Sequence, residues 1–115
     1  LRPTLTVSAP RAGIQSGPIA EFRFGVADAY TGIDPASLDV RADFAVNGRV
    51  PGAQLADLVE DLGDGRRRLA LSAPIAQLAR GVLTVAIADQ QGNVSRVQRV
   101  FAVANNTALF ANGFE

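Results

Sequence analysis

The strongest constraint on the fold is a hairpin pattern between residues 82 and 103, VLTVAIADQQGNVSRVQRVFAV. Two runs rich in β-branched residues flank the segment Asp89–Asn93, and this arrangement is typical of two antiparallel strands joined by a turn. Apolar residues recur at every second position, so each run is predicted to have one apolar face. These residues are Leu83, Val85 and Ile87 on the first run, and Val97, Phe101 and Val103 on the second, where Arg99 interrupts the pattern. The rest of the chain must therefore supply a second sheet that covers this face.

Four other segments show the same alternation and are predicted to be strands: Thr4–Ser8, Ile19–Ala27, Leu38–Val46 and Arg66–Ser72. The first follows Pro3 and precedes a second proline, which favours a position at a sheet edge. The side chains expected to face the core are Leu5, Val7, Ala20, Phe22, Phe24, Val26, Leu38, Val40, Ala42, Phe44, Val46, Leu69 and Leu71.

The segments between these strands carry turn or helix signals. Residues 11–18 are rich in Gly, Ser and Pro and are predicted to be a connection, and residues 73–81 are predicted to be a corner between two sheets. Asp34 before Pro35 matches a helix cap followed by a first-turn proline, which predicts one helical turn over Pro35–Leu38. Residues 50–62 fit either a helical turn or an irregular edge strand, and the pattern leaves both open.

Turn signals recur about every ten residues and no long helical pattern occurs, which predicts an all-β fold. The expected architecture is an antiparallel two-sheet β-sandwich of the immunoglobulin-like type, with about seven strands. We expect one domain over residues 1–104 and a separate C-terminal tail over residues 105–115. The tail ends in LFANGFE, which is apolar enough to dock on the sandwich or be read by an export system; the alternative is a frayed end.

The composition excludes several classes of chemistry. The 115 residues contain no Cys and no His, so disulfides, thiolate metal sites and a Ser-His-Asp hydrolase cannot be built from this chain alone. Eleven basic and eleven acidic residues give a formal net charge of zero, which argues against a nucleic-acid partner. No apolar run reaches the roughly 20 residues that a membrane span requires. The start Leu1-Arg2-Pro3 is neither an initiator methionine nor a signal peptide, which favours a processed fragment.

Three stretches carry a family resemblance: AEFRFGVADAYTGIDPASLDV at residues 20–40, the Leu78–Gly81 corner, and LTVAIADQQGNVS at residues 83–95. Over residues 3–103 the chain resembles the bacterial immunoglobulin-like domains of secreted and cell-surface proteins. The Cys pair and Trp of antibody domains are absent, as is usual for bacterial members. The resemblance implies a secreted, periplasmic or cell-surface spacer or accessory module, without catalysis, whose partners are neighbouring domains of the same polypeptide.

In an immunoglobulin-like topology, the loops around residues 28–34 and 89–93 lie at the same pole. Their oxygen-bearing side chains are candidate calcium ligands, since Ca²⁺ takes six to eight oxygen ligands. The candidates are Asp28, Asp34, Asp89 and Asn93. The favoured interpretation is structural: each side chain caps its own turn, because the spacing matches no known calcium loop. No cofactor other than this calcium candidate is expected.

Three further features of the sequence bear on function. The run Arg66-Arg67-Arg68 is split by strand alternation, which favours protection of a sheet edge over a basic binding patch, and Glu60, Asp61 and Asp64 are expected to neutralise it. Tyr30 is the one candidate for stacking on a sugar ring. Paired carboxylates such as Asp57 with Asp61, or Asp28 with Asp34, are possible acid–base pairs, but surface carboxylates are far more often solvated charges.

The sequence therefore predicts a non-catalytic immunoglobulin-like module, the C-terminal domain of a larger exported bacterial protein, which spaces or presents another domain. The alternative is an adhesion module that binds a glycan or a surface protein through the loops around Tyr30 and Gln90-Gln91. Neither hypothesis includes a nucleic-acid partner or a membrane span.

Overall fold

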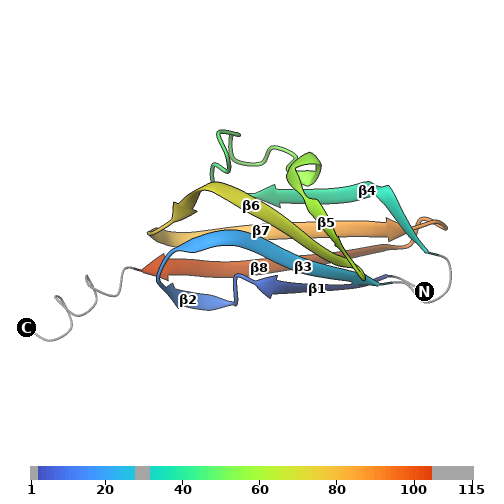
Figure 1. Ribbon diagram of the computed structural model, residues 1–115, viewed down its shortest axis with the longest axis horizontal. Coiled ribbons are helices and arrows are strands. Elements are labelled where there is room, and N and C mark those ends of the chain that lie inside the picture. The colour runs from blue at the N-terminus through green and yellow to red at the C-terminus, as the bar shows by residue number, and fades with distance from the viewer. Residues whose placement is uncertain (1–2, 28–31, 105–115) are drawn as a thin grey trace, which may run out of the picture.

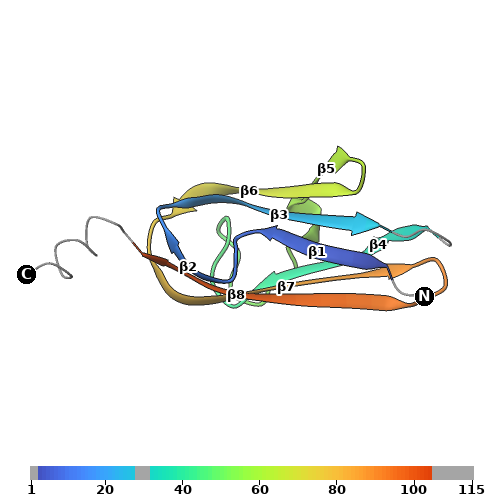
Figure 2. The ribbon, with the colours of Figure 1, turned by 90° about the horizontal axis from the view of Figure 1, so that it is seen from below.

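The computed structural model describes residues 3–27 and 32–104, which form two β-sheets packed face to face (Figures 1 and 2). One sheet has the strand order β1-β3-β6-β5 and the other β2-β8-β7-β4. The elements are β1 Thr4–Ala9, β2 Gly13–Ser16, β3 Ile19–Ala27, β4 Ile33–Ala42, the 3₁₀ helix η1 Ala56–Leu58, β5 Glu60–Gly63, β6 Arg66–Ile75, β7 Leu78–Asp89 and β8 Val94–Ala104. The predicted all-β two-sheet sandwich is confirmed. No helix in the described ranges is long and apolar enough to cross a bilayer.

The hairpin that organises the sequence is also the longest pairing in the structure. β7 has 12 residues and β8 has 11, and they pair antiparallel from Leu78 with Val103 to Ala88 with Val94. The predicted inward residues of β7, Leu83, Val85 and Ile87, are at most 1% exposed. As predicted, a corner before the hairpin carries the chain from β6 in one sheet to β7 in the other, but it comprises residues 76–77 rather than 73–81.

Two predictions about the first third of the chain are wrong. Gly13–Ser16 is not only a connection: it forms β2, which pairs parallel with Phe101–Ala104 of β8, so the fold is not purely antiparallel. In β3, a register shift between Ile19 and Glu21 brings Ile19 into the core and leaves Ala20 exposed, although the alternation favoured Ala20. The position of β1 at a sheet edge is confirmed.

The helical turn predicted over Pro35–Leu38 is also wrong, because this segment belongs to β4. The pairing of β4 with β7 shifts register between Asp34 and Asp39, so the extra residues form a bulge rather than a helix. Ser37 Oγ accepts a hydrogen bond from Ala88 N at 2.8 Å, which ties the bulge to β7. In residues 50–62, both open alternatives are realised, since η1 is followed directly by β5.

The core between the sheets is apolar and centres on three phenylalanine rings. Phe22, Phe44 and Phe101 meet pairwise edge to face, with ring centroids 5.7 to 6.3 Å apart. They come from β3, the segment after β4, and β8, so the cluster joins both sheets. Leu55, just before η1, is 2% exposed and closes this core from the side.

The described chain begins at one pole of the sandwich and ends at the other (Figure 1). Ser95 Oγ donates a hydrogen bond to the carbonyl oxygen of Pro3, which places the start of β1 beside the start of β8. From Ser95 to Ala104, β8 spans about 30 Å at the usual rise of about 3.3 Å per residue. The two ends of the sandwich are therefore separated by the full length of its last strand.

Candidate functional site

Asp89 is the buried polar residue of the pole turn between β7 and β8. The residue is 2% exposed, and its Oδ1 accepts hydrogen bonds from Gln91 N and Asn93 N, each at 2.9 Å. Its Oδ2 accepts a third bond from Asn93 Nδ2, also at 2.9 Å. The carboxylate thus satisfies donors of its own turn, as the capping interpretation predicts.

Gly32 and Ile33, at the start of β4, lie against this turn, so this end of β4 and the turn share one pole. Gln90 N donates to Gly32 O at 3.1 Å, and Gln90 Nε2 donates to Ile33 O at 3.0 Å. Asp34 Oδ1 accepts from Ala36 N at 3.2 Å, so this carboxylate caps the bulge of β4. Gln90 therefore joins the β7–β8 turn to the start of β4.

The calcium candidates can be placed only in part. Asp34 lies near the start of β4, and Asp89 and Asn93 lie at the turn between β7 and β8. Asp28 falls outside the described residues, as does the sugar-stacking candidate Tyr30. Within residues 3–27 and 32–104, no group of three or more Asp, Glu, His or Cys residues could hold a metal ion. Calcium binding at this pole stays a prediction.

The arginine run divides between the two faces of β6, as its alternation predicts. Arg67, at the parity of the buried Leu69, has a side chain that is 16% exposed and pairs with Asp61 at 2.6 Å. Arg68 points to the opposite face and pairs with Glu60 on β5 at 2.6 Å. Asp61 and Glu60 neutralise Arg67 and Arg68 as predicted, but among the described residues Asp64 forms no ion pair with the run. The predicted edge protection is wrong, because β6 lies between β3 and β5.

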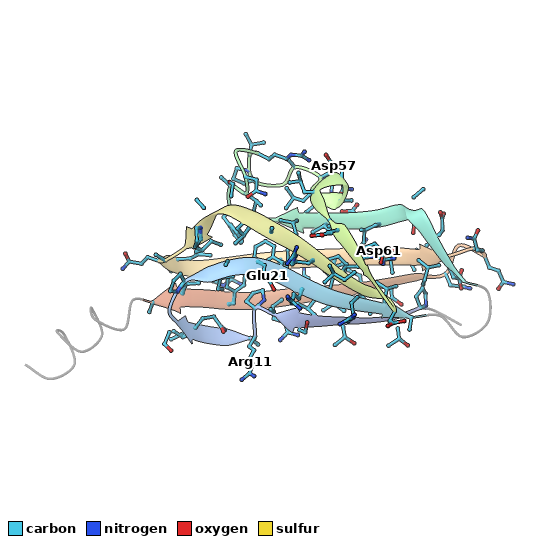
Figure 3. All side chains as sticks on the ribbon, viewed as in Figure 1. Arg11, Glu21, Asp57 and Asp61 are labelled. Carbon is cyan, nitrogen blue, oxygen red and sulfur yellow. The ribbon has the colours of Figure 1, made fainter. Side chains whose placement is uncertain are left out.

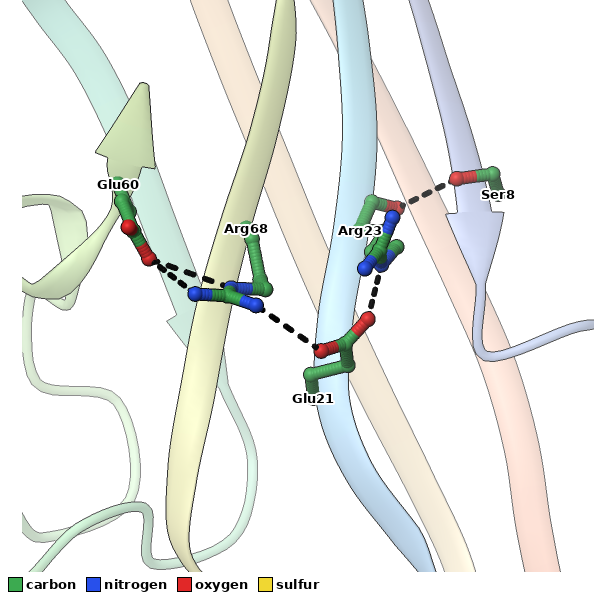
Figure 4. A network of polar contacts seen from close by, with 5 residues as sticks. All are labelled: Ser8, Glu21, Arg23, Glu60 and Arg68. Carbon is green, nitrogen blue, oxygen red and sulfur yellow. Dashed lines mark hydrogen bonds and ion pairs between the residues drawn. The ribbon is translucent and has the colours of Figure 1, made fainter. Parts of the chain in front are cut away.

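Arg68 belongs to a polar ladder across the outer face of the β1-β3-β6-β5 sheet (Figure 4). Its second contact is with Glu21 on β3 at 3.8 Å, and Glu21 also pairs with Arg23. Ser8 Oγ on β1 donates to the carbonyl oxygen of Arg23 at 3.3 Å. The ladder ties all four strands of this sheet, although exposed ion pairs each contribute at most about 1 kcal/mol.

Asp57 and Asp61, the possible acid–base pair, lie on different elements and contact different arginines. Asp57 is on η1 and Asp61 on β5 (Figure 3). Asp57 Oδ2 accepts from Arg49 Nη2 at 2.7 Å, and hydrogen bonds from Arg49 are the main cause that lowers the pKa of Asp57 and raises that of Arg49. Hydrogen bonding to Glu60 likewise raises the pKa of Arg68. A lowered carboxyl pKa keeps Asp57 ionised, which does not suit a general acid at neutral pH.

Two polar side chains, Asn47 and Gln54, make hydrogen bonds to other elements that the sequence did not predict. Asn47 donates from Nδ2 to Ala70 O at 3.0 Å and accepts from Ser72 N at 2.8 Å, so a turn residue after β4 bonds to β6 in the opposite sheet. Gln54 Oε1 accepts from Val40 N at 2.7 Å. The only sequence signal was the Asn47-Gly48 turn pair, which the structure confirms with a bridge between Val46 and Arg49.

Comparison with known proteins shows the fold and no more. No family model and no curated protein matches the chain. Among solved structures, an endo-β-1,4-mannanase from Thermotoga petrophila is similar, with a TM-score of 0.62 and 17% identity over 90% of this chain and 20% of that one. Dimeric latent PorU from Porphyromonas gingivalis gives 0.59 and 15%, covering 91% of this chain and 10% of that one.

CopC from Methylosinus trichosporium OB3b gives a TM-score of 0.56 and 11% identity, covering 89% of this chain and 95% of that one. These structures establish an all-β sandwich. This chain spans one fifth of the mannanase and one tenth of PorU, so in those two proteins the similar part lies within a larger polypeptide.

Proposed function

We propose that this chain is a non-catalytic immunoglobulin-like module that spaces or presents a neighbouring domain of a larger exported bacterial protein. The observation that carries the proposal is the placement of the two ends of the sandwich at opposite poles, about 30 Å apart along β8. A module with this geometry extends a chain of domains by a fixed length. The occurrence of the same fold inside the much longer mannanase and PorU chains supports this role.

The way the first and last strands are held supports the same role. Arg99 Nη2 on β8 donates to Val7 O on β1 at 2.9 Å, and Ser95 on β8 bonds to Pro3. Farther along the chain, β2 pairs parallel with the end of β8. Tension applied to the two ends would therefore slide these segments past one another and load their bonds together rather than one at a time.

A surface-display experiment tests the spacer role. A reporter domain is joined to a membrane anchor through zero, one or two copies of residues 3–104, and access of an antibody to the reporter is measured. We expect access to rise with each copy, and an unrelated β-sandwich of similar span to substitute equally well. A substitute that fails although it holds the same separation would contradict the proposal, because the module would then supply a specific contact. Saturable glycan binding that is lost in Tyr30→Ala would favour the adhesion alternative.

A further inference from the structure

The outer face of the β1-β3-β6-β5 sheet contains a hollow beside the polar ladder. Its volume is about 240 Å³. The side chains and backbone around it come from β1, β3, β5 and β6. The residues that the argument uses are Thr6, Ser8, Arg23, Gly25, Leu62 and Arg66.

Gly25 forms the floor of this hollow. It lies within β3 and pairs with Thr6 on one side and Arg66 on the other. Its φ is not in the left-handed region, and a Cβ built at this position would meet nothing within 4 Å. Neither backbone conformation nor crowding therefore requires glycine here. Glycine weakens the interior of a strand, and it often marks a place where a ligand approaches closely.

Among the described residues, one arginine beside the hollow has no carboxylate partner. Arg23 pairs with Glu21, and Arg67 pairs with Asp61 at 2.6 Å. In the described part of the chain, Arg66 has no carboxylate within 4 Å, and its one hydrogen bond is a long 3.5 Å contact from Nε to the carbonyl oxygen of Gly63. The exposed Arg66 guanidinium thus borders an open floor and pairs with no described carboxylate.

We propose that this hollow binds a carboxylate side chain of an acidic peptide segment on a partner polypeptide. The Arg66 guanidinium can donate two parallel N–H hydrogen bonds to the two oxygens of a carboxylate. The Thr6 hydroxyl offers a further donor at the rim, whereas the Ser8 hydroxyl already donates to the carbonyl oxygen of Arg23. Leu62 offers an apolar surface for the methylene groups of a Glu side chain.

No residue that lines the hollow in the described part of the chain exposes an aromatic ring, which disfavours a sugar acid as the ligand. The aromatic residue nearest to the floor, Phe24, is 2% exposed and belongs to the core. Sugar rings are usually held by stacking on an aromatic face, whereas a side-chain carboxylate requires only the donors present here. The site would exist whether or not the module serves as a spacer.

Amide NMR titration of residues 1–115 with a short Glu-rich peptide at low salt tests the site. We expect saturable shifts at Thr6, Gly25 and Arg66, which weaken as added salt screens the charges. Gly25→Val fills the hollow with a side chain that is favourable in β-strands. Arg66→Gln removes the positive charge and keeps a polar side chain. Each variant should bind roughly tenfold more weakly or worse. The matched control is Arg96→Gln, an exposed arginine on β8 in the other sheet, which should leave binding unchanged.

Binding of the peptide to both variants within about twofold of the wild-type affinity would overturn the proposal. So would shifts centred away from the hollow, or tighter binding of an oligogalacturonate than of the peptide. If Gly25→Val fails to fold, which its amide spectrum reveals, Arg66→Gln alone decides. The display experiment contains no acidic ligand, so failure of this site leaves the spacer result unaffected.

Discussion

Replacement of Asp89 by alanine should destabilise the sandwich by removing the centre of its pole turn. The Asp89 carboxylate accepts three hydrogen bonds of 2.9 Å, two from backbone N–H groups and one from the Asn93 side chain. A hydrogen bond to a charged group contributes about 1.5–3 kcal/mol, so simple addition would give roughly 5–9 kcal/mol.

The actual loss should be smaller for two reasons. Gln91 is exposed and Asn93 half-buried, so water can reach the freed donors. The backbone bonds from Asp89 N to Asn93 O at 3.0 Å and from Gly92 N to Asp89 O at 3.1 Å do not depend on the side chain. We therefore expect Asp89→Ala to lower the free energy of unfolding by about 2–4 kcal/mol.

Asp89→Asn is the matched control for the shape of this side chain. It keeps one oxygen for the two backbone donors, and a flip of the Asn93 amide restores the third bond with donor and acceptor exchanged. Only the charge is lost, so the expected cost is about 1 kcal/mol.

Urea denaturation at neutral pH measures both variants, with unchanged m-values as the sign of an intact two-state transition. Asp89→Ala should also lower the melting temperature by roughly 8–16 °C, at about 4 °C per kcal/mol. Added Ca²⁺ should shift neither the wild type nor the variant if the carboxylate serves only as a cap. The capping account is refuted if Asp89→Ala costs less than about 0.5 kcal/mol, or if Ca²⁺ stabilises the wild type but not the variant.

Other substitutions test the packing and the ion pairs. Gly65→Ala should lower the free energy of unfolding by about 2–4 kcal/mol in urea denaturation, because φ is 78° and the new Cβ would lie 2.1 Å from a carbonyl oxygen of β3. The control Gly25→Ala should change the free energy of unfolding by less than about 1 kcal/mol. Equal costs for the two variants would count against this geometry. Phe101→Ala should cost about 3–5 kcal/mol by the same assay, since its ring meets two others edge to face, and a cost near zero would mean that the core is loosely packed. Because hydrogen bonds from Arg49 lower the pKa of Asp57, their stabilisation should be present above the unfolded-state pKa and lost as the pH falls through the folded-state value. NMR titration should give a depressed pKa for Asp57 that rises toward the ordinary range of an exposed Asp in Arg49→Gln, and an unchanged pKa in that variant would argue against the pair.

Local alternation was sufficient to predict most strands that carry the core, although β4 ends at Ala42 rather than at Val46. The β7–β8 hairpin and the inward side of β6 follow from apolar residues at every second position, and Leu83 and Leu69 are fully buried as expected. The split of the arginine run has the same cause, because successive side chains of a strand point to opposite faces.

The errors arose where distant pairing decided the local conformation. Ile14 in β2 is 73% exposed, so its short strand has no buried alternation and is defined by pairing with β8. The Asp34-Pro35 signal is a real cap, but bonds between Ser37 and Ala88 hold the segment in the sheet. Such contacts join residues about fifty positions apart and leave no local signature.

Of the candidate sites, one follows from local sequence and the other depends on the pairing of distant strands. The turn role of Asp89 and Asn93 could be predicted because donor and acceptor are four residues apart. The hollow over Gly25 could not, since it depends on the register of three strands that place Thr6 and Arg66 on either side of that glycine.

The separation of the two poles is the central claim, and a spin-label distance measures it directly. The chain has no Cys, so Thr4→Cys with Ser16→Cys gives two unique labels on exposed residues, one at the start of β1 and one opposite Ala104 on β2. We predict one narrow distance distribution centred at about 30 Å, the length of β8 between the two poles. A distance below about 20 Å, or a broad distribution, would contradict a rigid module whose ends lie at opposite poles.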